Sequence, residues 1–167
     1  KERAFENARF AVDRVICGEG RGWKQATEEL AFERSGPERY LSCFVLLTPC
    51  VDVIGKDASP ATKSRIGAQI SSVATLINMS LSIAGKLNQG EDPALAASIV
   101  KDLGCQFEQG LPGLAQELCE LEPTLAGHGV DYQQVLGNLI QLAPSFSLRG
   151  GTPEIMRGII AKGLGVR

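Results

Sequence analysis

The chain has 167 residues, of which 44% are hydrophobic and 22% are charged, and its net charge at pH 7 is −2. This length suits one domain with a sizeable core, and the even mixture of acidic and basic residues argues against a nucleic-acid-binding surface. The continuous apolar runs are short and no secretory signal is recognisable, so no membrane partner is expected.

The cysteine content indicates the redox environment. Five cysteines, an odd number, are present and none has C-x-x-C spacing. This favours reduced thiols in a cytoplasmic protein over a disulfide framework. The single histidine, His128, has no second histidine or cysteine at ligand spacing, so a loop histidine is expected and no metal site is predicted.

The first fifty residues predict a strand-like opening followed by a helix. Residues 5–12 alternate like the last strands of a preceding sheet domain, and residues 18–22 form a Gly-rich hinge. A helix is expected from near Trp23 to beyond Glu33. Ser35-Gly36-Pro37 should interrupt it, because proline lacks the backbone donor, before it resumes to about residue 53.

Two longer helices are predicted next. One begins at Ser59-Pro60, a good N-cap and first position, and ends at Asn88-Gln89-Gly90. Another begins at Asp92-Pro93 and should bend or break at residues 110–113, where two glycines and a proline occur. The apolar positions with helical spacing are Ile66, Ile70, Val73, Ile77 and Leu81 in the first of these, and Leu95, Ile99, Leu103 and Phe107 in the second.

The last part of the chain predicts two shorter helices. Glu122-Pro123 stops the preceding one, and residues 125–130 form a Gly-rich loop. Helices are then expected from Asp131 to Leu142 and from Pro153 to about Lys162. Four or five helices with short connections predict an all-α fold, an antiparallel four-helix-type bundle.

The turn before the last helix is a candidate ligand site. Gly150 and Gly151 can take positive φ, Thr152 suits the N-cap and Pro153 suits the first helical position. A phosphate could bind the exposed N–H groups of such a helix start, and Glu154 could accept a hydrogen bond from a sugar hydroxyl. Without further context, an ordinary loop-to-helix cap explains the same residues.

Two motifs together resemble the acyl-CoA dehydrogenase family of flavoenzymes. The run Gly-Gly-Thr-Pro-Glu-Ile-Met-Arg-Gly-Ile-Ile-Ala-Lys-Gly-Leu-Gly at 150–165 is similar to the closing signature of that family. Gly18-Glu19-Gly20-Arg21-Gly22-Trp23, followed by Leu30-Ala31-Phe32-Glu33-Arg34, is similar to the junction between its middle β-domain and its C-terminal helical domain. Both motifs occur in the family's order.

The resemblance implies a domain division and a function. Residues 1–22 would be the end of the middle β-domain and a hinge, and residues 23–167 the C-terminal helical bundle domain of a longer polypeptide. The implied activity is FAD-dependent α,β-desaturation of an acyl-CoA thioester in fatty acid metabolism. Electron-transfer flavoprotein would be the acceptor, and a homo- or hetero-oligomer, a dimer or homotetramer, the assembly.

The resemblance also suggests which residues would act. The family's catalytic base stands either before the Gly-Thr of the last motif, here Gly150, or on the first helix before an arginine, here Glu33. Gly150 has no side chain, so Glu33 is the predicted base, as in the isovaleryl- and long-chain-type members, with Arg34 as an orienting or structural partner. Gly151, Thr152 and Glu154 are the predicted FAD contacts. An ion-paired surface role for Glu33 is the simpler alternative.

Three departures from the family pattern keep other functions open. Residues 56–60 replace an Arg-x-x-Phe-Gly-type segment, Gly127-His128-Gly129 only partly represents the adenosine loop, and Arg149 replaces an aromatic residue. One alternative is a noncatalytic subunit or oligomerisation domain. Another is a flavin monooxygenase of the same fold, which would need no carboxylate base.

Overall fold

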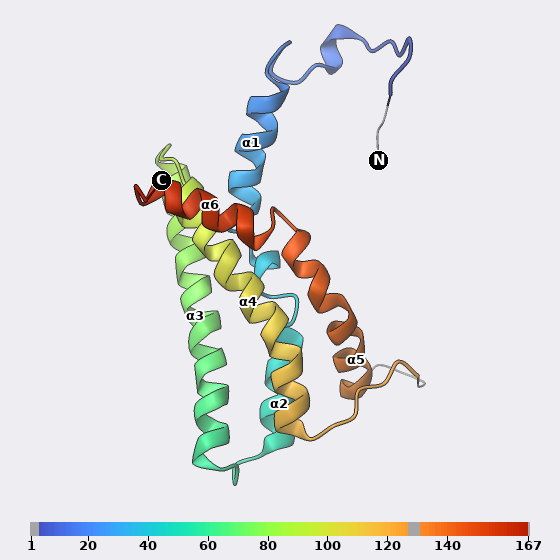
Figure 1. Cartoon of the computed structure of the whole chain (residues 1–167), viewed down its shortest axis with the longest axis vertical. Helices are drawn as coiled ribbons and strands as arrows, with labels where there is room; N and C mark the ends of the chain where they lie inside the picture. Colours follow the sequence, from blue (N-terminus) through green and yellow to red (C-terminus); the bar gives the residue numbers. More distant parts are fainter. Residues whose placement is uncertain (1–3, 127–130, 167) are drawn as a thin grey trace.

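The computed structural model describes residues 4–126 and 131–166, whose regular secondary structure is helical, with no strand among them. This confirms the prediction of an all-α chain. Short 3₁₀ helices occur at Val12–Arg14, Pro37–Arg39, Phe44–Leu46 and Ala143–Leu148. The α-helices, drawn in Figure 1, are α1 (Gly22–Glu33), α2 (Leu47–Ile54), α3 (Pro60–Asn88), α4 (Ala94–Cys119), α5 (Tyr132–Leu142) and α6 (Pro153–Gly163).

Helix α4 is the centre of the fold, since it contacts each of the other five α-helices. In Figure 1, α3 lies beside it, α2 and α5 flank its lower part, and α6 crosses near its upper end. The core that these helices share is apolar and includes Leu46, Cys50, Val73, Leu76, Ile83, Val100, Leu111, Leu136 and Phe146.

Helix α3 begins where the sequence predicts. Ser59 Oγ accepts a hydrogen bond from the backbone N–H of Thr62 at 3.1 Å, and Pro60 takes the first helical position. The predicted apolar face is only partly buried, because α4 covers a face rotated away from it: Leu76 and Ile83 are buried instead. The residues left exposed from that predicted face are Ile70 (49%), Ile77 (38%) and Leu81 (65%).

The same helix is also long and apolar enough to cross a membrane, judged by length and composition alone. Core helices pass the same test, but only 22% of the 18-residue window in α3 is buried. Much of its apolar surface therefore faces outward in this chain.

Helix α4 runs unbroken through residues 110–113, so the break that the sequence allowed there does not occur. Pro112 has no N–H to donate to the carbonyl of Glu108, four residues earlier. The thiol of Cys43 takes that role, with 3.2 Å between its sulfur and Glu108 O. A tertiary contact thus satisfies the carbonyl that the proline leaves without a helical partner.

The chain before α2 differs from the sequence prediction in two ways. No strand forms in residues 4–21, which are exposed and contain one 3₁₀ turn. A strand needs a neighbouring edge for its hydrogen bonds, and Figure 1 shows this segment extending away from the helices. After α1, short 3₁₀ turns replace the predicted resumption of the helix until α2 begins at Leu47.

The two C-terminal helices agree closely with the prediction. Asp131 caps α5 by accepting a hydrogen bond from Gln134 N at 2.8 Å. Thr152 is the N-cap of α6, although its side chain makes no capping hydrogen bond, and Pro153 is the first helical residue.

Candidate functional site

The end of α1 meets the turn that precedes α6. Arg34, which follows the last residue of α1, donates a hydrogen bond from Nε to the carbonyl oxygen of Gly150 at 3.0 Å. Glu33 forms an ion pair with Arg39, and the guanidinium of Arg39 also borders Gly150. The structure therefore brings together the two segments that carry the predicted catalytic and cofactor-binding residues, although they are more than a hundred positions apart.

Glu33 itself is half-buried. Its side chain is 41% exposed, whereas that of Arg39 is 5% exposed. Arg39 contacts Glu33 at a second point: its Nε donates a hydrogen bond to the backbone carbonyl of Glu33 at 3.0 Å. This carboxylate is therefore partly open to water, whereas a carboxylate base of this kind works best in dry surroundings. The ion pair matches the simpler structural role that the sequence also allows.

The Gly150–Gly151 turn has the conformation that the sequence predicts. The φ angles are 71° at Gly150 and 112° at Gly151, a region that residues with a side chain rarely adopt. A Cβ atom on Gly151 would also lie 2.6 Å from Met156 Cε. The positive φ favours glycine at both positions, and a Cβ would be crowded only at Gly151.

The other two predicted FAD contacts lie at the start of α6. Thr152 is half-buried and Glu154 is exposed. Hydrogen bonds from its own backbone N–H and from Thr152 lower the pKa of the Glu154 carboxyl. Its carboxylate thus already interacts with the positive end of the helix, and a phosphate would have to displace it there.

Beneath the turn lies a cluster of buried charges that the sequence did not suggest. Glu108, on α4, is fully buried and accepts from Ser42 N at 2.8 Å and from Arg149 Nη2 at 2.6 Å. Arg149 also lies 4.4 Å over the ring of Phe146. Lys101, which is also on α4 and buried, donates a hydrogen bond from Nζ to the carbonyl oxygen of Phe146 at 3.0 Å.

We call Arg39, Lys101, Glu108 and Arg149 the charge cluster; the first three are buried, and the side chain of Arg149 is 32% exposed. It contains three cations and one carboxylate. Burial lowers the pKa of Lys101 and of Arg39, and the positive charge of Arg149 lowers both further. Glu33 and Glu38 also pair with Arg39, so the carboxylates at the cluster equal its three cations in number.

The residues around the turn can therefore be tested for their fit to the FAD that the resemblance implies. The positive charge of Arg34 beside Gly150 suits a pyrophosphate, whereas Arg39 is already paired with Glu33 and Gly151 packs closely against Met156. Arg34, Gly151 and Thr152 would hold it. The Gly127-His128-Gly129 segment, the counterpart of the adenosine loop, lies outside the described residues.

Sequence patterns could have revealed part of this cluster. Lys101 and Glu108 are seven residues apart, which places two charges on one face of α4. The same face carries the small residues Ala97, Gly104 and Cys105, all buried. A charge on a small-residue face indicates a buried ion pair. The partner Arg149 could not be found this way, because it comes from a distant turn.

Trp23, the one tryptophan of the chain, lies far from this turn along α1. It is 83% exposed at the start of α1, away from Glu33 at the other end of that helix. In this chain it lines no site with Glu33.

Comparison with known proteins finds no matching family model and no matching curated protein. The resemblance to acyl-CoA dehydrogenases therefore depends on the two sequence motifs alone.

Proposed function

We propose that this chain is the C-terminal helical domain of an FAD-dependent acyl-CoA dehydrogenase, with Glu33 as the base that removes the α-proton. The single observation that supports this most is the hydrogen bond from Arg34 to Gly150. It joins the helix end that carries the base to the turn that would receive the pyrophosphate. The helices α2 to α5 around a shared core are consistent with the four-helix-type bundle of that domain.

In this proposal each residue has a defined task. If FAD were held at the turn before α6, it would supply the hydride acceptor for the β-hydrogen. Glu33 accepts the α-proton at a carboxylate oxygen. Arg39 orients that carboxylate in the resting state and must give up its ion pair, because a carboxylate held by a cation is a weaker base. A thioester bound over Glu33 would displace water from this half-exposed side chain and strengthen it as a base.

The test compares two glutamates that share one arginine. Glu33 and Glu38 both pair with Arg39, the latter at 3.6 Å. In the flavin-bound full-length protein, anaerobic acyl-CoA should bleach the flavin absorbance. Glu33→Gln should bind the thioester without bleaching, while Glu38→Gln should bleach normally. Bleaching by Glu33→Gln at the parent rate would remove Glu33 from the mechanism.

The second candidate function is assembly without catalysis, and a specific surface favours it. The outward face of α3 exposes Ile70, Ile77 and Leu81, and no charged residue occurs between Arg65 and Lys86. An uncharged apolar face of this length suits packing against another helix.

Sedimentation velocity distinguishes this role from catalysis. Ile77→Glu should dissociate an oligomer that uses the face, while Ser64→Glu, exposed on another side of the same helix, should not. A flavin-free, inactive full-length protein that still assembles through α3 would favour the noncatalytic role.

A further inference from the structure

Two buried thiols touch at the lower end of the fold. Cys50 lies on α2 and Cys119 is the last residue of α4, and their sulfur atoms are 3.2 Å apart. Cys50 is 0% and Cys119 is 9% exposed. Neither the motifs nor the proposed function uses this pair, which the structure records as free thiols.

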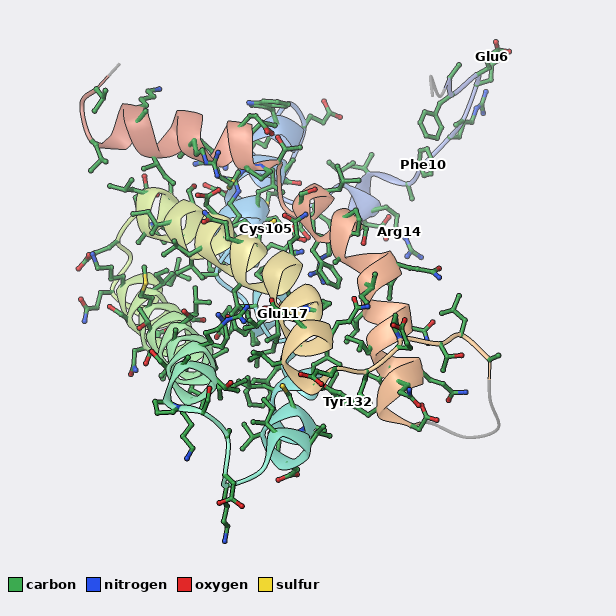
Figure 2. All side chains as sticks on the ribbon, turned by 60° about the horizontal axis from the view of Figure 1, so that its bottom comes forward. Glu6, Phe10, Arg14, Cys105, Glu117 and Tyr132 are labelled. Atoms are coloured by element: carbon green, nitrogen blue, oxygen red, sulfur yellow. The ribbon has the colours of Figure 1, made fainter. Side chains whose placement is uncertain are left out.

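The surroundings hold the two sulfurs in this arrangement. The Cys119 thiol also faces the carbonyl of Cys50, at 3.9 Å, and the hydroxyl of Tyr132, at 3.8 Å. Tyr132 is fixed in turn by donating to the carbonyl of Leu46 at 3.2 Å. Figure 2 labels Tyr132 beside the end of α4. Three helices thus converge on the pair.

We propose that Cys50 and Cys119 are a redox-sensitive pair whose oxidation to a disulfide joins α2 to the end of α4. A disulfide requires the sulfurs to approach to about 2.05 Å, a movement of roughly 1.1 Å from the observed contact. Small rotations of two side chains can supply such a movement. The other two buried cysteines, Cys43 and Cys105, have no sulfur as a hydrogen-bonding neighbour among the described contacts.

Hydrogen peroxide is a sufficient oxidant. The Cys119 sulfur, the more accessible one, attacks a peroxide oxygen, breaks the O–O bond and becomes a sulfenic acid while one water leaves. The Cys50 thiol then attacks that sulfur and displaces a second water. Two thiols and one peroxide give one disulfide and two waters. Burial raises the pKa of Cys50 to about 12, which keeps it protonated and makes the reaction slow without local opening.

The bond would act on stability and on α2. It closes a loop between positions 69 apart, which reduces the entropy of the unfolded chain. It also anchors α2 next to Val51, which lines an apolar hollow with Ile70 and Ile77. Oxidation would therefore restrict the movement of α2 where it borders the exposed apolar face of α3.

The test uses the protein with Cys17→Ser, because Cys17 is exposed and could cross-link two chains. Reduced protein has four thiols that can be titrated after denaturation. After treatment with hydrogen peroxide and removal of the excess, two should remain. The melting temperature should rise by roughly 5–15 °C and return to its original value with dithiothreitol.

The partners are assigned with single variants. The masses of linked tryptic peptides cannot assign the partners by themselves. No Lys or Arg separates Cys43 from Cys50, or Cys105 from Cys119, so trypsin leaves each of these two pairs within one peptide. Cys43→Ala and Cys105→Ala should still lose two thiols on oxidation. Cys119→Ala should lose none, and Cys50→Ala should form no disulfide and lose at most the Cys119 thiol, as a sulfenic acid. If a core variant fails to fold, tandem mass spectrometry of the linked peptides from the Cys17→Ser protein identifies the bonded sulfurs.

Three results would overturn the proposal. One is four thiols remaining after peroxide. Another is a cross-link that includes Cys43 or Cys105. The third is an oxidised protein that melts at or below the temperature of the reduced one.

Discussion

Arg149 Nη2 lies 2.6 Å from Glu108 Oε2, and this contact connects the turn before α6 to the centre of α4. The carboxylate is fully buried and the arginine side chain is 32% exposed. A second Arg–Glu pair, Arg65 with Glu117, has the same separation, but its side chains are 43% and 63% exposed. The two pairs differ mainly in burial, which should determine how much each one stabilises the fold.

The first prediction follows from this contrast. Arg149→Ala should lower the free energy of unfolding by about 2–4 kcal/mol, because it leaves the buried carboxylate of Glu108 without its cation. Arg65→Ala should barely move the urea midpoint, since water screens the exposed pair. Equal shifts for both variants would contradict this reasoning.

The second prediction concerns two glycines of α4. A Cβ on Gly104 would lie 2.5 Å from the carbonyl oxygen of Arg39, whereas one on Gly110 would meet nothing within 4 Å. Gly104→Ala should therefore cost about 1–3 kcal/mol of stability by overpacking. Gly110→Ala should add roughly 0.5–1 kcal/mol, because alanine favours the helix. Chemical denaturation measures both, and a stabilising Gly104→Ala would show that the segment around Arg39 can move away.

The third prediction tests the link between Pro112 and Cys43. Pro112→Ala restores an N–H that can donate to Glu108 O, the carbonyl now bound by the thiol. Cys43→Ala should therefore destabilise the parent more than it destabilises the Pro112→Ala variant, by about 1 kcal/mol. A double-mutant cycle measures this coupling. Pro153→Ala, at the first position of α6, is the control and should show no coupling to Cys43.

The fourth prediction concerns alkaline pH. Burial, and then the negative charge of Glu108, raises the pKa of Cys43 to about 12 from an ordinary 9.0. The folded chain keeps a proton that the unfolded chain loses, so this stabilisation is complete below pH 9 and is lost as pH rises toward 12. Stability should fall in that window with a contribution of at most about 1.4 kcal/mol per pH unit from Cys43.

Urea midpoints between pH 8.5 and 10.5, at roughly half-unit steps, measure that fall. Cys43→Ala should show a shallower decline than the parent, while Cys17→Ser, which changes an exposed thiol, should follow the parent. Lys101, whose pKa burial lowers, contributes in the opposite direction, but it is present in all three proteins and cancels in the comparison. Parallel curves for Cys43→Ala and the parent would rule out Cys43 as a source of the decline.

Local sequence signals predicted the ends of most helices. Ser59-Pro60 and Asp131 act through hydrogen bonds or ring geometry within a few residues, so their effect does not depend on distant contacts. The positive φ angles of Gly150 and Gly151 were predictable for the same reason. The continuity of α4 through Pro112 could not be predicted, because the group that replaces its missing donor, Cys43, is remote in sequence.

The sequence by itself determined an all-helical chain, its helix starts and the chemistry available at Glu33 and at the glycine turn, because caps, prolines and glycines act over one or two turns. Only the tertiary structure decided which face of α3 is buried, that Glu108 meets Arg149, and that Arg39 binds Glu33. Those outcomes depend on how α4 packs against its neighbours. Helical periodicity identifies apolar positions but cannot say which of them a distant helix will cover.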